Sequence, residues 1–460
     1  MTTATSVSGA DSCSGLGAHG YDSARRQWWL VIVLLVVSTL GAIDRQVIAL
    51  LVNPIREHLQ VTDTQMSVII GAAFGVSNTL FTLPAGYLAD RVSRRGLILA
   101  GALVWSLMTM ACGTAVSFAQ LFLARAGVGF GESVIQPCAL SMLRGALSPQ
   151  RRARGFSVLY MSLTGGSSLA LIVGGLLVSV LASSGPHYLP VVGPVRPWQL
   201  TLILIGLVGI PAGLLVLTAR EPARSADGVR SSAGGYFVAW SLIRSRWKLY
   251  VPLLLFQLAM LMLSLSYAAW LPAMVQRLWH LSFAQIGVTL GLMMLLLPPI
   301  GLYIAGQWMD SAAARRGVSG PVMVGLFATA LVALAATAAP LAFGLSAFWV
   351  LFGALMLVSG TVFPLAATVT ASITPAASMG KVTAVQFFVT GLFAPVIGPT
   401  VVALVSDTFF SGPRALALSM AVVCGVYSFV SLAALVVLLR AIKAAPPIVE
   451  SDASSMRGAL

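Results

Sequence analysis

Long apolar runs alternate with short polar links along almost the whole chain. A transmembrane helix needs about 20 apolar residues, and twelve runs reach that length. The first six are Trp28–Leu51, Gln65–Leu88, Gly96–Val116, Phe118–Leu143, Phe156–Ala182 and Trp198–Leu217. The second six are Tyr250–Val275, Ala284–Trp308, Val318–Ala339, Phe343–Ile373, Val382–Val405 and Ala415–Leu439. The pattern therefore predicts an all-α membrane protein with twelve transmembrane helices.

The basic residues of the links lie almost entirely on one side of this arrangement. Twenty-one Lys and Arg residues fall on one side, and only Arg56, Arg196, Arg277 and Arg414 fall on the other. Positive links stay in the cytoplasm, so we expect both termini to be cytoplasmic. For a multi-pass protein of this kind we expect the cell (inner) membrane as its location.

The longest internal polar link divides the chain into two halves. We expect a disordered cytoplasmic tail at 1–27, a six-helix bundle at 28–219, a cytoplasmic linker at 220–248, a second six-helix bundle at 249–441 and a tail at 442–460. The end of the linker, Tyr236–Lys248, mixes aromatic and basic residues. It fits either an interfacial helix or a collapsed linker.

The two halves repeat at a constant offset of 220 residues. The matching pairs are Gln65 and Gln285, Gly71 and Gly291, Gly86 and Gly306, Asp90 and Asp310, and Arg95 and Arg315. Pro137 and Pro364 match at a slightly larger offset. Six spans followed by six related spans in the same orientation predict a parallel repeat, with a cleft between two bundles that rock against each other.

Composition narrows the class of protein further. Of 460 residues, 58% are hydrophobic and 9% are charged, against about 25% charged residues in soluble domains. The net charge of +14 follows from the links, so no nucleic-acid partner is expected. Neither a P-loop nor a Ser/His/Asp or HExxH pattern is found, and the four cysteines are scattered. We expect no enzyme activity, no cofactor and no metal.

Four ionisable residues lie within the predicted spans: Asp44, Arg45, Arg125 and Glu132. Charges inside a membrane pair with each other or face a wet cavity, and they mark functional sites. Arg125 and Glu132 are two turns apart and share a helix face. We interpret Asp44 and Glu132 as exchangeable proton sites, with Arg45 and Arg125 tuning them or binding an anionic substrate. A static salt-bridge cluster is the alternative.

Weaker signals come from other polar and small residues. Tyr160, Tyr267 and Gln386 lie in apolar runs, where they either line the cleft and contact substrate or bond a neighbouring helix. The glycine pairs at 165–166 and 174–175 favour helix packing over binding.

The link after the second span carries a charged loop, Gly86-Tyr-Leu-Ala-Asp90-Arg91-Val-Ser-Arg94-Arg95-Gly96. Gly86 is expected to allow tight helix packing, and the arginines to anchor to phosphate headgroups or to acids on neighbouring loops. The loop recurs in the second half as Gly306, Asp310, Arg315 and Arg316. This recurrence indicates a gating latch rather than a link that only sets topology.

These residues resemble a known family. The loop from Gly86 to Arg95 resembles the signature loop of the major facilitator superfamily. The resemblance to this superfamily extends over nearly the whole chain. The stretches that resemble its Spinster-type branch are Asp44-Arg45-Gln46, Asn53-Pro54-Ile55, Thr62-Asp63-Thr64-Gln65, Leu88–Arg91, Trp105-Ser106, Arg125–Glu132 with Pro137, Trp270-Leu-Pro272 and Gln276-Arg277. The anion–cation symporter branch shares the Asp-Arg pair in the first span.

The resemblance implies proton-linked transport, with the four charged residues as the coupling and headgroup-binding cluster. Animal Spinster members move lysophospholipids or sphingosine phosphate, so a lysolipid-like anion is one candidate substrate and a small organic acid is the other. The expected partners are this substrate, protons and membrane lipids, and the expected state is a monomer.

Two departures from the family pattern stand out. An acidic residue usual near the end of the fourth span is replaced by Arg144-Gly145, so Arg94 is expected to lack its partner. The fifth span also lacks the Gly-Pro element of many drug–proton antiporters, which disfavours multidrug efflux. Two other functions stay open: facilitative uniport of small organic acids, and a membrane receptor that does not transport.

Overall fold

The computed structural model describes residues 24–185, 187–190, 193–222, 234–375 and 378–444. Most of the two predicted tails and the middle of the predicted linker lie outside these residues, as do Cys13, Arg224, Arg230 and Arg457. The division into domains therefore stays a proposal at those boundaries.

The first half of the chain forms the helices α1 (Ala24–Val47), α2 (Val52–Leu59), α3 (Asp63–Ser67), the π-helix η1 (Val68–Ala73), α4 (Phe74–Arg91), α5 (Arg94–Thr114), α6 (Phe118–Glu132), α7 (Ile135–Ala146), α8 (Pro149–Ser183) and α9 (Pro197–Leu215), with the 3-10 turn η2 (Val216–Thr218). A short hairpin of β1 (His187–Leu189) and β2 (Gly193–Val195) precedes α9.

The second half forms α10 (Gly234–Ser245), α11 (Trp247–Trp279), α12 (Phe283–Arg316), α13 (Ser319–Ala338), α14 (Leu345–Ser359), α15 (Val362–Ile373), α16 (Met379–Phe409) and α17 (Ala415–Ala444). The helix α10 falls in the predicted linker and packs against α16 and α11, so this part of the linker is helical rather than collapsed.

Eleven helical stretches of the described residues are long and apolar enough to cross a membrane. The predicted fourth span is the one missing, because it is split into α6 and α7 at Ser133 and Val134. Pro137 lies in the first turn of α7, where its ring prevents a continuous helix through residue 133. Pro364 follows the break between α14 and α15 in the same way. The twelve-helix, all-α fold is confirmed.

The internal repeat appears in the structure as matched local contacts. Thr62 with Gln65, and Ser282 with Gln285, form equivalent capping boxes at the starts of α3 and α12. Such boxes satisfy the free amides of a first turn. The two halves therefore begin their second spans with the same device, 220 residues apart.

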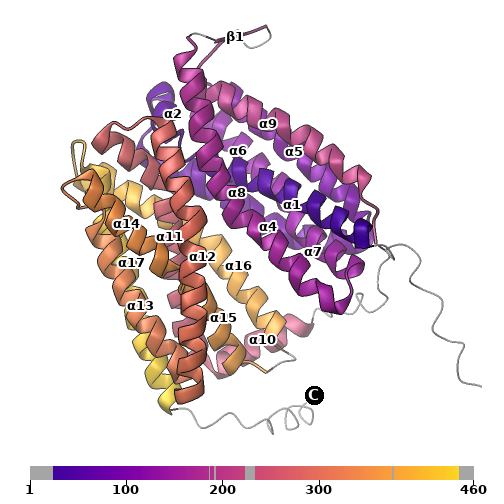
Figure 1. Cartoon of the computed structure of the whole chain (residues 1–460), viewed down its shortest axis with the longest axis vertical. Coiled ribbons are helices and arrows are strands. Elements are labelled where there is room, and N and C mark those ends of the chain that lie inside the picture. Colours follow the sequence, from indigo (N-terminus) through magenta and orange to yellow (C-terminus); the bar gives the residue numbers. More distant parts are fainter. Residues whose placement is uncertain (1–23, 186, 191–192, 223–233, 376–377, 445–460) are drawn as a thin grey trace, which may run out of the picture.

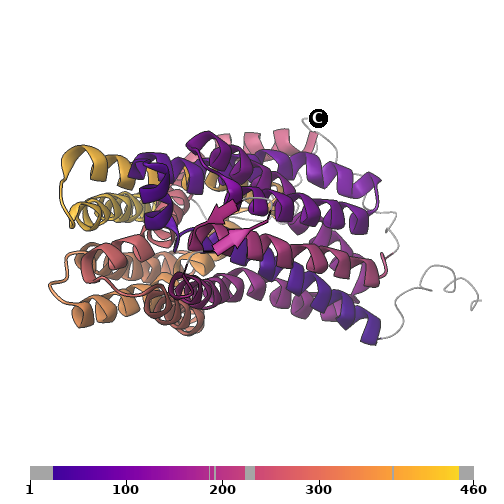
Figure 2. The same cartoon turned by 90° about the horizontal axis from the view of Figure 1, so that it is seen from above.

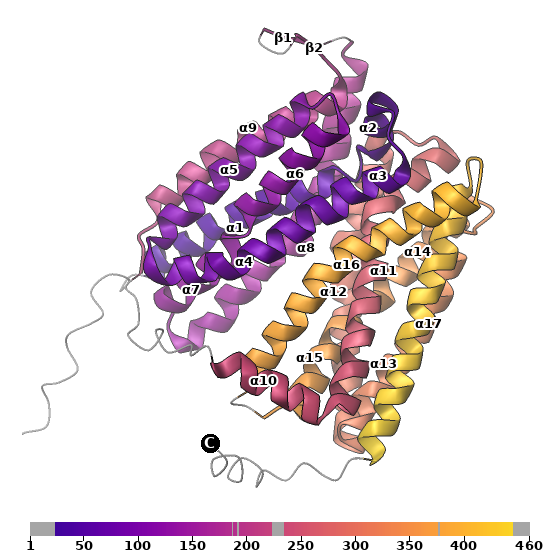
Figure 3. The ribbon, with the colours of Figure 1, turned by 180° about the vertical axis from the view of Figure 1, so that it is seen from behind.

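The two halves form two helical bundles that meet at one end of the molecule and diverge toward the other (Figures 1 and 3). We name the meeting end, which carries the β-hairpin and α2, the hairpin end. The opposite end, which carries α10, is the α10 end. Viewed from above, the first bundle (indigo to magenta) and the second (orange to yellow) lie side by side (Figure 2).

Two seams of close backbone packing join the bundles. In one, α8 packs on α12, and a methyl group at Gly287 would lie 2.1 Å from the Leu171 carbonyl oxygen. In the other, α16 packs on α3, η1 and α4, and a methyl group at Gly71 would lie 2.0 Å from the Pro395 carbonyl oxygen. Only glycine fits at such contacts, so these positions hold the bundles together near the hairpin end.

Candidate functional site

The four charged residues of the spans come together as two ion pairs inside the first bundle. Arg125 Nη1 on α6 lies 3.9 Å from Asp44 Oδ2 on α1. Arg45 Nη2 donates a 2.7 Å hydrogen bond to Glu132 Oε2. The neighbours Asp44 and Arg45 point about 100° apart around α1, and each reaches a different partner on α6.

The first pair is sealed in the bundle. The side chains of Asp44 and Arg125 are each 1% exposed, and Thr109 of α5 donates a 2.8 Å hydrogen bond to Asp44 Oδ1. Asp44 also lies in the last turn of α1, where the negative helix end repels a carboxylate. The hydrogen bond from Thr109 and the charge of Arg125 stabilise the Asp44 carboxylate against this repulsion.

The second pair is half open. The side chain of Arg45 is 46% exposed, whereas that of Glu132 is 3% exposed. The next residue, Gln46, donates to the Ala268 carbonyl of α11 in the second bundle, so Arg45 lies beside the junction of the bundles. A guanidinium is too costly to expose to lipid, and its exposed part must therefore face water between the bundles.

The three glycines of α6 allow its neighbours to approach closely. A methyl group at Gly129 would lie 2.5 Å from the Phe74 carbonyl oxygen, one at Gly131 would lie 2.6 Å from the Trp105 nitrogen, and one at Gly127 would meet Met108. The slim helix brings Arg125 and Glu132 against α4 and α5.

Buried atoms of the cluster keep unused hydrogen-bonding capacity. Asp44 Oδ2, Glu132 Oε1, and Arg125 Nε and Nη2 are buried without a hydrogen-bond partner. Unsatisfied buried groups of this kind are costly, and they mark sites for a proton, a water molecule or a ligand. The cluster is thus poised to change its bonding rather than being fully satisfied.

One aromatic ring of the cluster was missed by the sequence analysis. The Phe74 ring centroid lies 5.1 Å from the Arg45 guanidinium carbon and 5.4 Å from that of Arg125. Both distances fall in the range of cation–π attraction. An isolated Phe in an apolar run gives no signal by which the sequence could have identified it.

The three polar residues proposed for substrate contact lie in different surroundings. Tyr160 is exposed. It lies three helical turns before Leu171, so it is on the same face of α8 as the residues that pack on α12 nearer the hairpin end. Tyr267 is buried, donates to the Ala336 carbonyl and stacks on Phe352. In this conformation its hydroxyl is bonded within the second bundle, which fits the alternative that Tyr267 bonds a neighbouring helix.

Gln386 of α16 is also buried in the second bundle. Its Oε1 accepts a 3.3 Å hydrogen bond from Thr370 of α15, while its Nε2 is buried without a partner. The amide therefore braces two helices and keeps one free donor pair.

A polar network joins the two bundles at the hairpin end, and sequence reasoning did not anticipate it. Arg277 of α11 binds both oxygens of Asp63 at 2.7 Å and donates to Asn53 Oδ1 at 2.9 Å. Asn53 in turn donates to Gln276 at 2.6 Å, and Arg56 lies 3.2 Å from Asp63. The signal was present in the sequence, because Arg277 is one of only four basic residues on its side.

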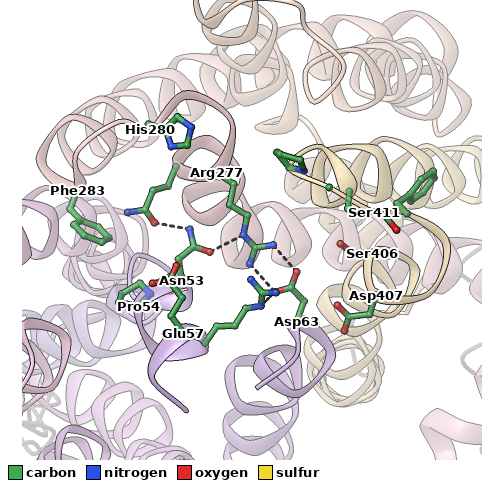
Figure 4. Close-up of a pocket in the computed structure, with 16 residues that line it drawn as sticks. Asn53, Pro54, Glu57, Asp63, Arg277, His280, Phe283, Ser406, Asp407 and Ser411 are labelled. Carbon is green, nitrogen blue, oxygen red and sulfur yellow. Dashed lines mark hydrogen bonds and ion pairs between the residues drawn. The ribbon is translucent and has the colours of Figure 1, made fainter. Parts of the chain in front are cut away.

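A second contact lies beside this network. Asp407 Oδ2 of α16 accepts from the Thr64 nitrogen at 2.8 Å and from the Thr64 hydroxyl at 2.7 Å. A cavity of about 800 Å³ opens here, lined by residues of both bundles that include Glu57, His280 and Ser411 (Figure 4). We name the contacts of Asn53, Arg56, Asp63, Thr64, Gln276, Arg277 and Asp407 the hairpin-end network.

The charged loop at the α10 end corrects one expectation. Arg94 does not lack a partner: its Nε lies 3.1 Å from Glu221 Oε1, and its guanidinium also binds Ser141 and the Pro222 carbonyl. Glu221 lies in the loop after α9 and η2, so the acid follows the sixth span rather than lying near the end of the fourth, where the family pattern led us to expect it. Partial burial opposes ionisation of Glu221, but hydrogen bonds from Ser93 and Arg94 outweigh it and lower its pKa to about 2.

The remaining latch residues differ between the two copies of the loop. Arg95 donates to the Leu217 and Ala219 carbonyls, and Arg91 lies over the Tyr87 ring at 4.1 Å. Asp90, Asp310 and Arg315 are exposed at the helix ends. The first copy is thus tied into its own bundle.

The expectation of tight helix packing at Gly86 is not met in this conformation. A methyl group at Gly86 or at Gly306 would meet nothing within 4 Å. The reason is that the bundles have separated at the α10 end, where these residues lie.

The family model described as Major Facilitator Superfamily matches residues 34–399. The chain belongs to the Major Facilitator Superfamily. It is therefore a multi-pass membrane transporter and not an enzyme.

Curated relatives of this major facilitator chain differ in their names. An MFS-type efflux pump of Mycolicibacterium smegmatis is 30% identical over 300 residues, 63% of this chain and 64% of that protein. The spinster protein of Drosophila melanogaster is 26% identical over 200 residues, 44% and 31% of the two chains. The 4-hydroxybenzoate transporter of Pseudomonas putida is 26% identical over 210 residues, 45% of each. The matches span less than two thirds of these relatives.

A solved structure agrees with the fold. The crystal structure of a bacterial homolog to the human lysosomal transporter Spinster, in an inward-facing and unoccupied conformation, aligns with a TM-score of 0.74 and 22% identity. The alignment covers 91% of this chain and 96% of that one. Together with the spinster relative, it confirms the resemblance to the Spinster-type branch.

Proposed function

We propose that this transporter moves an organic or amphipathic anion by alternating access, coupled to protons. The observation that carries the proposal is the half-open ion pair, in which a half-exposed Arg45 is held by the buried Glu132. The arginine can reach a solute while its carboxylate partner cannot.

An anion that enters between the bundles competes with Glu132 for Arg45. When the guanidinium turns to a carboxylate or phosphate of the solute, Glu132 loses its 2.7 Å partner. A buried carboxylate without a partner is unstable as an ion and takes up a proton instead. Solute binding and proton binding are linked in this way, without contact between the two.

The sealed pair has a different role in this scheme. Asp44 and Arg125 are paired inside the bundle in this conformation, on the same two helices, α1 and α6, that hold Arg45 and Glu132. Because Asp44 Oδ2 and Arg125 Nη2 have no hydrogen-bond partner, we propose Asp44 as the second proton site.

Alternating access requires the contacts between the bundles to break at one end and form at the other. Here the hairpin-end network closes one end. With both termini in the cytoplasm, as the basic links favour, this conformation is open to the cytoplasm and the hairpin end faces outward from the cell membrane.

Two substrate classes fit the site. A lysolipid-like anion is favoured by the Spinster resemblance, and a small aromatic acid by the relative that bears the name of a 4-hydroxybenzoate transporter. The relative named as an efflux pump favours export as the direction of transport. Both classes offer Arg45 the same chemistry, a carboxylate or phosphate on an apolar body.

The decisive experiment uses purified protein in proteoliposomes with an imposed pH gradient. The probes are 4-hydroxybenzoate and a short-chain lysophosphatidylglycerol, each radiolabelled. The wild-type protein is expected to concentrate one of them, and Glu132→Gln to exchange it without concentrating it. Glu57→Gln, an exposed acid on α2, is the matched control and should behave as wild type.

The alternatives give different results in the same experiment. Unchanged proton-driven accumulation in both Glu132→Gln and Asp44→Asn rules out the proton sites proposed here. Equilibration of a probe without proton movement, followed with a pH-sensitive dye, indicates uniport. Binding without flux indicates a receptor.

A further inference from the structure

The second membrane span is a continuous helix with an unusual turn in the middle. It runs from Asp63 to Arg91 as α3, η1 and α4, and the π-helix η1 covers Val68–Ala73. π-helical turns inside α-helices are rare and occur frequently at functional sites. Phe74 is the first residue after this turn.

One side of this span follows α16 of the second bundle for four turns. The contacts are made by Thr64 with Asp407, Ser67 with Thr400, Gly71 and Gly75 with Pro395, and Thr79 with Gly391. In a regular α-helix, the three steps from residue 67 to residue 79 would rotate the contact face by about 120°. The wider turn of η1 keeps the face on α16.

The other side of the span, at Phe74, meets the charged cluster. The ring lies within cation–π distance of both Arg45 and Arg125, and it is 8% exposed. Its backbone is fixed to α6, because Gly129 packs on the Phe74 carbonyl and Asn78 donates to the Gly129 carbonyl at 3.2 Å. The position of the Phe74 backbone is therefore set by the packing of this span on α6.

We propose that Phe74 is the positioning residue that links closure of the bundles at Pro395 to the two arginines. The proposal rests on Arg45 acting as the anion-binding group. When the bundles part at Pro395, η1 loses its contact with α16 and the segment just before Phe74 is free to turn. The ring then shifts under both guanidinium groups, and the hold of Arg45 on Glu132 changes with the conformation.

The ring is well suited to this task because it holds the arginines without neutralising them. Each guanidinium keeps its acidic partner, Glu132 or Asp44, while the ring face restrains its position. An acid in place of Phe74 would compete with the solute, and an aliphatic residue would fill the space without attracting the cations.

The test is free of solute and measures how often the α10 end is open. Spin labels are attached at Val92→Cys, after α4, and Gly380→Cys, in α16, in a background with the native cysteines replaced. Double electron–electron resonance in nanodiscs then gives the ratio of long to short distances. Phe74→Leu is expected to lower this ratio by about three- to tenfold, the range for loss of a cation–π contact.

Two comparisons separate positioning from packing. Phe74→Tyr keeps the ring and is expected to give the wild-type ratio, and Phe74→Met is a second apolar variant in case Leu fails to fold. In an Arg45→Gln background, Phe74→Leu is expected to cause a smaller further change than in the wild type, because only the contact with Arg125 is left to lose. Equal shifts from Tyr and Leu, additive shifts with Arg45→Gln, or no shift from Leu and Met each overturn the proposal. Because no solute is used, a failure of the proposed transport function shows only in the flux assay.

Discussion

Two ion pairs of the same chemistry serve different ends because their surroundings differ. Asp44 and Arg125 are shut away from water, whereas Arg45 is half exposed above a buried Glu132. Breaking a fully buried pair is strongly destabilising, but a half-exposed pair can exchange its partner at lower cost. Burial thus decides which of the two pairs can exchange its partner in this conformation.

Thr109 is the residue that fixes the sealed pair. Thr109→Val keeps the side-chain shape but leaves Asp44 Oδ1 without its 2.8 Å donor, so it should destabilise the protein by about 1–3 kcal/mol. Thermal unfolding in detergent measures this. Thr114→Val, an exposed threonine at the end of the same helix, should change the midpoint little, and equal midpoints for both variants would contradict the role of Thr109.

Glu221 should make the stability of the folded protein depend on pH. Its pKa falls from the ordinary 4.5 to about 2 in the folded protein, so its stabilisation is complete above about pH 4.5. It is lost as the pH falls through about 2. Glu221→Gln should therefore lower the unfolding midpoint at pH 7, and the gap from wild type should narrow between pH 5 and pH 3. A gap that stays constant over this range would exclude the ionised form as the cause.

At the residue scale, the sequence shows which charged residues form the site but not which side chains surround them. Four charges in one bundle were evident, because each is rare within an apolar span. Phe74 and Thr109 were not, since nothing in an apolar run marks which Phe or Thr faces a charge. The partner of Arg94 was missed because Glu221 lies after the sixth span. Only the folded structure brings Glu221 next to Arg94, which lies between the second and third spans.

At the scale of elements, one glycine and its turn decide how close the bundles come. Gly71 lies within η1, and its backbone touches the Pro395 carbonyl. The seam tolerates no side chain at that point, whereas positions toward the α10 end have room.

Gly71→Ala should therefore weaken closure at the hairpin end. Its methyl group would lie 2.0 Å from the Pro395 carbonyl oxygen, and the two backbones must separate. Gly86→Ala on the same span is the matched control, since its methyl group meets nothing within 4 Å. Spin-label distances across the hairpin end should lengthen in the first variant and not in the second. A shift in both, or in neither, would refute this reading of the seam.

Helix positions follow from the sequence to within a few residues for most spans, because a run of about twenty apolar residues is typical of a membrane-spanning helix. The break between α6 and α7 was not predicted, although Pro137 is visible, because apolar residues continue across it. The helix α2 and the β-hairpin were missed since both are short and lie between spans, where hydropathy gives no pattern.

At the scale of the whole molecule, the two bundles are joined at the hairpin end and separated at the α10 end. The hairpin end is closed by charged and polar side chains that reach across from one bundle to the other. The seam glycines add close packing. Opening this end must break the hairpin-end network, and the two bundles can then rock.

Arg277→Ala should shift the molecule away from the present conformation. The substitution removes two 2.7 Å hydrogen bonds to Asp63 and one to Asn53, and it leaves Asp63 with Arg56 alone. Spin labels at Gln60→Cys and Ser411→Cys should report a larger fraction of long distances across the hairpin end. Arg414→Ala removes a nearby exposed arginine and should not, which tests whether net charge alone explains the shift.

The empty space around Gly86 has a practical consequence. Gly86 lies three helical turns from Gly75, on the face that meets α16, so this space is what the bundles fill when the α10 end shuts. A bulky residue there would act as a wedge. Gly86→Trp should therefore give a protein that binds its solute but does not complete the transport cycle. Such a variant could be used to capture the solute from a mixture.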